Sequence, residues 1–386
     1  MDSKNPIFLY YLFCFLIGFY IANGTTVLFE RELGFSFQQV FVLGGLYMLM
    51  FVLFEVPSGA LADLLGRRNC VVLGCFVLTL GAVATGLSNN FWQVFASFFL
   101  WAMGFSFISG ADEALLYDKL ADQNEYAKVF GRARFFAIIG TALAGILGPV
   151  LYSQNFRWPY LASAIPFFLA AIAMLGFEES HQKRGFSLRA HVDQIKDGLQ
   201  HAWENRYVRW SILIMSLTFA VWYNLLNSYQ PVLQELGFGV RVFSVILPIM
   251  FAAEAVGSGL AGKFYGFFGE VKVFWISVLG LGTVLLVTGL WYVQFALAFI
   301  FAYQFFLGVL RPAVSAYANG HIESHHRATV ISAQGMVSTV FAAGTLFLSG
   351  GLSDAIGLRY LVVILGGLVL VAGLGLLIYQ PKQKNS

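Results

Sequence analysis

The stretch Gly59-Ala60-Leu61-Ala62-Asp63-Leu64-Leu65-Gly66-Arg67-Arg68 closes the second long apolar run of this chain and brings charge directly after a charge-poor segment. Much later in the chain, Ser258, Gly259, Gly262 and Gly266 repeat its glycine frame at the end of another apolar run. In that second copy Lys263 takes the place of Asp63, and both arginines are missing. The two copies indicate an internal duplication.

The composition excludes a water-soluble globular domain. Apolar and aromatic residues make up 59% of the chain and charged residues only 11%. About 20 apolar residues rising 1.5 Å each cross the roughly 30 Å core of a bilayer, so each long apolar run predicts a transmembrane helix. The sequence therefore predicts an all-α integral membrane protein with twelve such helices. The runs lie near residues 7–28, 38–60, 69–88, 92–117, 134–153, 159–177, 208–228, 242–262, 273–291, 294–317, 330–349 and 358–379.

The basic residues predict the orientation of the chain. Outside the spans, only Arg31, Arg157, Arg241 and Arg359 fall on the side opposite the termini, whereas the other lysines and arginines fall on the side of the termini. Lysine and arginine favour the cytoplasmic side of a membrane. We therefore expect a multi-pass protein of the plasma (inner) membrane with both termini in the cytoplasm. The net charge of +3 gives no indication of a nucleic-acid partner.

A long polar segment, residues 178–207, divides the spans into six and six. We expect an N-terminal bundle in 1–177, a cytoplasmic linker in 178–207 and a C-terminal bundle in 208–386. Apolar residues recur in the linker at helical spacing, which predicts an amphipathic helix on the inner membrane surface. A solvated linker helix without membrane contact is the alternative. The apolar positions are Leu188, Val192, Ile195, Leu199 and Trp203.

The residues Gly59, Asp63, Gly66, Arg67 and Arg68 stand at the spacing of the cytoplasmic loop signature of the major facilitator superfamily, although Leu64 replaces a usual arginine. With twelve spans and a central polar loop, the chain resembles that superfamily over nearly its whole length. The resemblance implies two pseudo-symmetric six-helix bundles that rock about a central site. It also implies a conformational latch, in which Asp63 and Arg67 join an acidic residue at the end of the fourth span. Asp118 fits that place. Alternatively, Arg67 and Arg68 serve only as topology signals.

Two differences from the patterns of the superfamily bear on which of its branches this chain resembles. Many proton-coupled members carry an arginine four residues before the glycine of the fourth span, where this chain has Leu100 before Gly104. Antiporter-like members carry a glycine-rich signature in the fifth span, of which Gly140, Gly145, Gly148 and Pro149 form part. The partial signature favours a resemblance to the drug:proton antiporter branch.

Charged residues inside the spans are the candidates for coupling, because a charge at mid-bilayer costs about 3 kcal/mol and usually faces a cavity. Glu254 lies near the centre of the eighth span and is the first candidate for a proton carrier. A permanent ion pair between Glu254 and Arg311 of the tenth span is the alternative interpretation. The full set of coupling candidates is Glu254, Arg311, Asp112, Glu113 and Glu55.

Polar and aromatic residues of the spans that line the central cavity in that superfamily are the candidate substrate contacts. Aromatic residues make up 17% of the chain, which favours a cavity for an amphipathic or aromatic solute. The candidates are Asn23, Trp101, Trp222, Tyr223, Asn224, Asn227, Tyr303, Gln304 and Gln334.

The sequence thus predicts a proton-coupled transporter that exports a small amphipathic or aromatic solute by alternating access. A symporter or uniporter that imports an organic solute is the first alternative, and a non-transporting membrane receptor is the second. We expect no enzyme activity, no metal and no cofactor, with a proton gradient as the energy source. The expected partners are the solute, protons and lipid, and the protein is expected to be a monomer.

Overall fold

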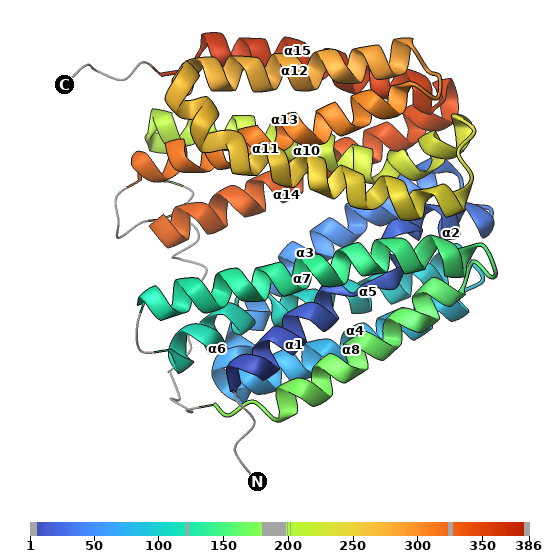
Figure 1. Cartoon of the computed structure of the whole chain (residues 1–386), viewed down its shortest axis with the longest axis vertical. Helices are drawn as coiled ribbons and strands as arrows, with labels where there is room; N and C mark the ends of the chain where they lie inside the picture. Colours follow the sequence, from blue (N-terminus) through green and yellow to red (C-terminus); the bar gives the residue numbers. More distant parts are fainter. Residues whose placement is uncertain are drawn as a thin grey trace. The chain divides into compact units, whose positions relative to one another are not determined.

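The computed structural model of this protein describes residues 6–120, 123–179, 198, 200, 202–322 and 327–381. Within these residues the regular structure is entirely helical, and twelve segments are long and apolar enough to cross a membrane (Figure 1). This confirms the predicted all-α membrane fold with twelve spans.

The helices follow the apolar runs of the sequence closely. In the first part of the chain they are α1 Pro6–Gly18, η1 Ile21–Gly24, α2 Thr26–Glu32, α3 Phe37–Leu65, α4 Arg67–Leu87, α5 Phe91–Ile108, α6 Ala111–Lys119, α7 Gln123–Tyr152 and α8 Trp158–Leu175. In the second part they are α10 Arg206–Glu235, η2 Val240–Val242, α11 Phe243–Phe268, α12 Glu270–Leu290, α13 Ala296–Gly320, α14 Arg327–Ile356 and α15 Leu358–Ile378.

The chain forms two compact units. The first contains the described residues of Met1–Phe35, Leu46–His191 and Val240–Leu247, and the second contains those of Ser36–Gly45, Val192–Gly239 and Pro248–Ser386. The long helices α3 and α11 therefore contribute to both units. The amphipathic helix expected within 178–207 falls mostly outside the described residues.

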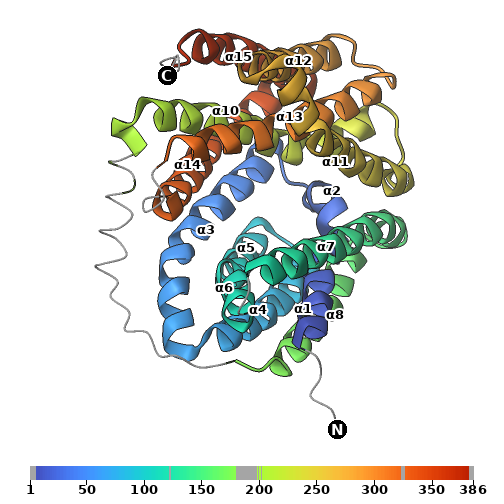
Figure 2. The same cartoon turned by 60° about the vertical axis from the view of Figure 1, so that its left-hand side comes forward.

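Each unit repeats the same set of helix pairs. In the first unit α4 packs on α5 and α8, while α1 packs on α7 and α8. In the second unit α12 packs on α13 and α15, while α10 packs on α14 and α15, and α12 and α15 lie side by side in both views (Figures 1 and 2). The repetition of these pairs shows the internal duplication in three dimensions.

The turns that precede α4 and α12 show which residues of the two copies correspond. Gly66 precedes α4 with φ 90°, and Gly269 precedes α12 with φ 77°, both in the left-handed region that favours glycine. Gly266, which the sequence comparison paired with Gly66, lies inside α11 instead. The true register is therefore shifted by three residues. The closely spaced glycines at the end of α11 made several alignments equally good in the sequence.

Two predicted spans are interrupted. The first consists of α1, the short 3₁₀ helix η1 and α2, and the fourth is split into α5 and α6. The split occurs at Gly110, whose φ of 76° ends the first helix and starts the second. Asp112 and Glu113 consequently lie in the first turn of α6. Hydropathy alone predicted one continuous helix here, because a single glycine hardly lowers the mean hydropathy of a long apolar span.

The glycines of the fifth span allow close packing of α7 against α1 and η1. A Cβ atom on Gly140 would lie 2.3 Å from the carbonyl oxygen of Phe15, and one on Gly148 would lie 2.2 Å from that of Ile21. Any side chain at either position would push the helices apart. This contact gives the partial glycine signature a packing role in this chain.

Candidate functional site

Two charged side chains meet within the second unit. The Arg311 guanidinium of α13 donates a hydrogen bond from Nη1 to Oε1 of Glu254 on α11, at 2.7 Å. The side chains remain 32% and 23% exposed, respectively. The sequence proposed this pair as one of two interpretations of Glu254.

Glycines hold the two helices together at this pair. A Cβ atom on Gly308 of α13 would lie 2.2 Å from the carbonyl oxygen of Glu254. A Cβ atom on Gly257 of α11 would lie 2.2 Å from the carbonyl oxygen of Phe305. Each glycine thus admits the backbone of the other helix, which places Glu254 within reach of Arg311.

Trp222 of α10 lies against the same arginine. The Arg311 Cζ atom lies 4.4 Å from the centre of the Trp222 ring, within the range of a cation–π contact. Arg311 therefore has two partners of different kinds, a carboxylate on α11 and an aromatic ring on α10.

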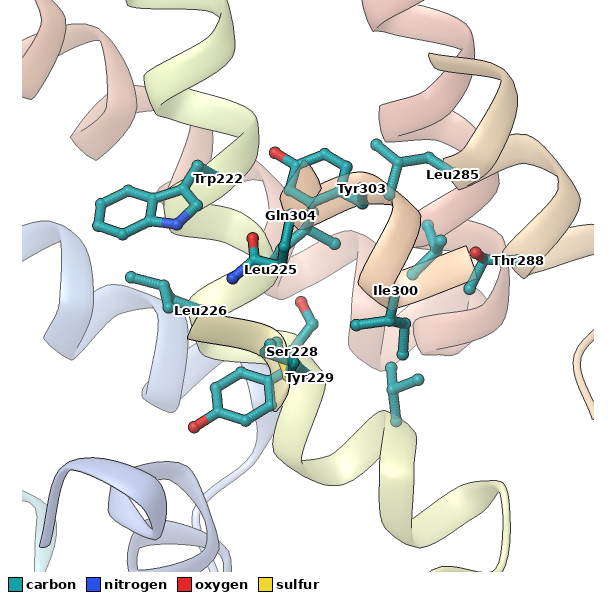
Figure 3. Close-up of a pocket in the computed structure, with 13 residues that line it drawn as sticks. Trp222, Leu225, Leu226, Ser228, Tyr229, Leu285, Thr288, Ile300, Tyr303 and Gln304 are labelled. Carbon is teal, nitrogen blue, oxygen red and sulfur yellow. The ribbon is translucent and has the colours of Figure 1, made fainter. Parts of the chain in front are cut away.

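Trp222 also lines a pocket inside the second unit, whose space between atoms, including the part open to solvent, is about 530 Å³ (Figure 3). The lining carries no charged side chain. In Figure 3 the Gln304 carboxamide points toward the space beside Trp222 and Leu226. Gln304 is only 5% exposed, and no hydrogen bond of its side chain is found among the described residues. The lining residues are Trp222, Leu225, Leu226, Ser228, Tyr229, Val232, Met250, Leu285, Thr288, Ile300, Tyr303, Gln304 and Val362.

The pocket brings together three of the predicted substrate contacts, namely Trp222, Tyr303 and Gln304. Asn224 has a structural partner instead, because its amide nitrogen donates to the Ala220 carbonyl at 2.8 Å and to Thr345 Oγ1 at 3.0 Å. The amide nitrogen of Asn227 donates to the Tyr223 carbonyl at 2.9 Å.

The remaining substrate candidates lie away from the pocket lining. Gln334 of α14 is buried. In the first unit, Asn23 is exposed on η1. Trp101 of α5 is 4% exposed, and its indole nitrogen donates to Thr85 Oγ1 at 2.9 Å. Its ring also lies 5.6 Å from that of Phe167, centre to centre. These contacts place Trp101 in the core of the first unit.

Arg67 of the signature loop makes one of the contacts that the sequence predicted for the latch. Arg67 pairs with Asp118 at 2.5 Å, and the same guanidinium nitrogen donates to the Ala114 carbonyl at 2.8 Å. Asp63, by contrast, makes no hydrogen bond or ion pair within the described part of the chain. Gly59 and Gly66 complete the loop, and Gly66 forms its turn.

A residue from outside this loop, Glu179, also binds it and was not among the predicted site residues. The Glu179 carboxylate accepts hydrogen bonds from the backbone N–H groups of Arg67 and Arg68, at 2.8 and 3.2 Å. It therefore caps the positive end of α4. Arg68 in turn donates to the Leu175 carbonyl at 2.8 Å. The acidic pair that follows α8 was the available signal, but its distance from Arg67 in the sequence concealed the contact.

The other coupling candidates lie in the first part of the chain. Glu113 pairs with Arg134 of α7 at 2.8 Å. Together with Tyr10, Cys14 and Arg134, Asp112 lines a pocket whose space between atoms, including the part open to solvent, is about 620 Å³. The backbone carbonyl of Glu55 accepts a hydrogen bond from Ser58 at 2.7 Å. None of these three carboxyl groups lines the pocket of the second unit.

Proteins similar to this chain show its family and its fold. A family model described as Major Facilitator Superfamily matches residues 8–265 and 233–386. An uncharacterized MFS-type transporter of Bacillus subtilis, YxaM, is 22% identical over 230 residues, which are 58% of this chain and 57% of that protein. The inner membrane transport protein YajR of Escherichia coli is 33% identical over 113 residues, 28% of this chain and 23% of that protein.

The multidrug resistance protein MdtH of Baumannia cicadellinicola is 26% identical over 164 residues, 41% of this chain and 38% of that protein. The chain thus spans less than two thirds of the length of each of these relatives. Among solved structures, the nucleoside transporter NupG superposes with a TM-score of 0.80 at 13% identity, covering all of both chains. A bacterial homolog of the human lysosomal transporter Spinster gives a TM-score of 0.77 at 14% identity, covering 97% of this chain and 95% of that one.

Proposed function

Because the chain belongs to the Major Facilitator Superfamily, a family of membrane transporters, we propose that it exports a small amphipathic or aromatic solute in exchange for protons. The membership itself establishes a multi-pass transporter rather than an enzyme. The class of solute, the direction of transport and the coupling to protons are the proposal.

One observation carries this proposal. The Glu254–Arg311 pair, at 2.7 Å, lies next to an uncharged pocket, and Trp222 touches both. A charged pair inside a membrane span is costly, and such residues usually face a cavity and take part in transport. Protonation of Glu254 would remove the negative charge of the pair and so weaken the attraction between the carboxyl group and Arg311. A proton site so placed can influence a solute in the adjoining pocket.

The chemistry of the pocket supports the proposed class of solute. Aromatic and aliphatic side chains form most of the lining, and the amides and hydroxyls of Gln304, Ser228 and Thr288 supply polar groups. Such a lining favours an amphipathic ring system over a sugar or an ion. The similarity to MdtH, which is named a multidrug resistance protein, supports export.

We further propose the arrangement in the membrane. The basic residues favour cytoplasmic termini, and the similarity to YajR, named an inner membrane protein, supports a bacterial inner membrane. Residues 1–177 and 208–386 would act as the two rocking halves, joined by 178–207, and the repeated helix pairs support this division.

Transport by the purified protein in proteoliposomes tests the proposal. Neutral aromatic dyes, including Nile red, are followed after a pH gradient is imposed in either direction. If the protein exchanges solute for protons, the dye should move in the direction opposite to the protons. Glu254→Gln should abolish this gradient-driven movement. Dye movement with the protons would establish the importing alternative. An absence of gradient-driven movement for every dye would overturn the proposal.

A further inference from the structure

Trp222 belongs to two neighbouring groups of residues at once. Its ring lines the pocket, and the Arg311 guanidinium lies 4.4 Å from the centre of that ring. Arg311 is also bonded to Glu254 at 2.7 Å. The three side chains come from α10, α13 and α11, so the chain of contacts crosses three helices of one unit.

We propose that Trp222 is the positioning residue through which the charge state of Glu254 controls the affinity of the pocket. This inference rests on the proposed function, since it assigns the link between proton and solute within that exchange.

The sign of the link follows from the two partners of Arg311. When Glu254 is ionised, the carboxylate holds the guanidinium. When Glu254 is protonated, the face of the Trp222 ring becomes the stronger of its two attractions. A solute that stacks on Trp222 competes for that ring and so favours the ionised carboxylate. Proton and solute therefore oppose each other, as exchange requires, and the opposition is reciprocal.

The surroundings of Glu254 contain few other groups that could produce the same effect. Within the described residues, the charged or titratable side chains that interact with it are Arg311 and Tyr303, both on α13. Tyr303 is 3% exposed and lines the pocket as well. A Tyr303→Phe variant therefore belongs in the test, because it removes the hydroxyl and keeps the ring.

The test compares Trp222→Leu with Trp222→Phe in proteoliposomes. The KM for Nile red efflux is measured over a series of pH values. Wild-type protein and Trp222→Phe should show an affinity that depends on pH by about 2- to 30-fold, the range of a cation–π contact. Trp222→Leu should lose that dependence. Tyr229→Leu, which changes another aromatic side chain of the pocket lining, should weaken affinity equally at every pH. Tyr303→Phe should keep the wild-type dependence of KM on pH.

A second readout needs no solute. The tryptophan emission of Trp222, taken as the difference between wild type and Trp222→Phe, should change with pH and become flat in a Glu254→Gln background. An unchanged pH profile in Trp222→Leu, or a pH-dependent difference emission that persists in Glu254→Gln, would overturn the inference. If the difference emission titrates as expected while no dye follows a proton gradient, the proposed function fails and the link through Trp222 stands.

A carboxylate from another helix lies at the start of α3. The Asp354 carboxylate, at the end of α14, accepts hydrogen bonds from the backbone N–H groups of Phe37 and Gln38, both at 2.8 Å. It therefore caps the positive end of α3. Although more than 300 residues separate them in sequence, these residues belong to the same compact unit.

The residues around Asp354 repeat the signature loop. The run Gly350-Gly351-Leu352-Ser353-Asp354-Ala355-Ile356-Gly357-Leu358-Arg359 places a glycine, an aspartate, a glycine and an arginine at the spacing of Gly59, Asp63, Gly66 and Arg68. Gly357 also forms its turn with φ 85°, close to the 90° of Gly66. The likeness therefore extends from the sequence to the backbone.

Glycines seat the start of α3 against α14. A Cβ atom on Gly350 would lie 2.8 Å from the Cα atom of Gln38, so only a glycine fits there. The Gln38 side chain donates to the Phe347 carbonyl at 3.4 Å. The cap is thus one part of a tight contact.

The geometry points to a second latch, formed by Asp354 and the start of α3, at the opposite end of that helix from Asp63. The 29 residues of α3 extend about 43 Å, enough to cross the bilayer. In this structure Asp354 is bonded, whereas Asp63 has no polar partner among the described residues. We infer that the two aspartates are engaged in alternate states of the transport cycle, whatever its solute or coupling ion.

Labelling of a buried reporter tests this latch. Val40 of α3 is 0% exposed, so a Val40→Cys reporter, in a chain whose three native cysteines are replaced by alanine, reacts with an impermeant maleimide only when the contact opens. Asp354→Asn removes the negative charge and one of the two acceptor oxygens at the positive end of α3, which corresponds to about a 2- to 30-fold change in an equilibrium, and it should raise the labelling rate within that range.

Gly350→Ala should raise the labelling rate as well, by a different route, since it forces the helices apart. Ser353→Ala is the matched control and should leave the rate unchanged, because among the described residues that hydroxyl bonds only within its own helix, to the Ser349 carbonyl. Asp63→Asn should lower the rate. Wild-type labelling in folded Asp354→Asn and Gly350→Ala, or faster labelling in Asp63→Asn, would refute the latch.

Discussion

The close contact of α11 with α13 can be tested by two substitutions in one helix. Gly257 and Gly259 both lie in α11, two positions apart. A Cβ atom on Gly257 would lie 2.2 Å from the Phe305 carbonyl oxygen, whereas one on Gly259 would meet nothing within 4 Å. Gly257→Ala and Gly259→Ala therefore add the same methyl group to a closed site and to an open one.

The expected magnitude follows from the difference between the two variants. Both gain the helix propensity of alanine, about 1 kcal/mol, which cancels in the comparison. Overpacking costs about 1–3 kcal/mol, and only Gly257→Ala incurs it. To relieve a 2.2 Å contact, the helices must separate by about 1 Å. The same separation would stretch the 2.7 Å hydrogen bond between Arg311 and Glu254 beyond its normal range.

Thermal unfolding, followed by tryptophan emission in detergent, measures the difference in stability. Gly257→Ala should melt below Gly259→Ala and should also lose proton-driven transport, whereas Gly259→Ala should keep it. Equal melting temperatures together with equal transport would refute the packing account of the site.

Three further predictions concern other parts of the chain. Trp101→Phe should lower the free energy of unfolding by about 1 kcal/mol, because the hydrogen bond to Thr85 is lost. It should leave the KM for Nile red unchanged, and a changed KM would show that Trp101 contacts the substrate. Gln304→Leu should raise the KM for Nile red, whose carbonyl can accept from the amide, and an unchanged KM would exclude that contact. A double-mutant cycle on Arg67 and Asp118, measured by thermal melting, should give a coupling energy of about 0–1 kcal/mol, because the Asp118 side chain is 43% exposed. A coupling energy several times larger would indicate a buried network.

Much of the fold could be predicted because apolar runs long enough to cross a bilayer leave little choice of structure. The run near 273–291, for example, became α12 at Glu270–Leu290. The breaks in the first and fourth spans could not be predicted in this way. They depend on local geometry, such as the positive φ of Gly110, to which an average over twenty residues is insensitive.

The candidate site was predictable to a similar extent. Glu254 and Arg311 were conspicuous as charges inside spans, and their contact was one of two stated interpretations. The contact of Trp222 with Arg311 could not be predicted, because it depends on how α10 packs against α13. The caps made by Glu179 and Asp354 were missed for a related reason, since each joins backbone groups that carry no signal in the sequence. For Asp354, the repeated glycine, aspartate and arginine spacing was a signal that could have been found.

The most direct test of proton exchange is the movement of protons themselves. Proteoliposomes that contain the internal pH indicator pyranine are loaded with Nile red, and the internal pH is recorded as the dye leaves. The account predicts that dye efflux acidifies the interior of wild-type vesicles and that Glu254→Gln abolishes the signal. Dye efflux from wild-type vesicles without proton entry, or undiminished proton entry in Glu254→Gln, would contradict it.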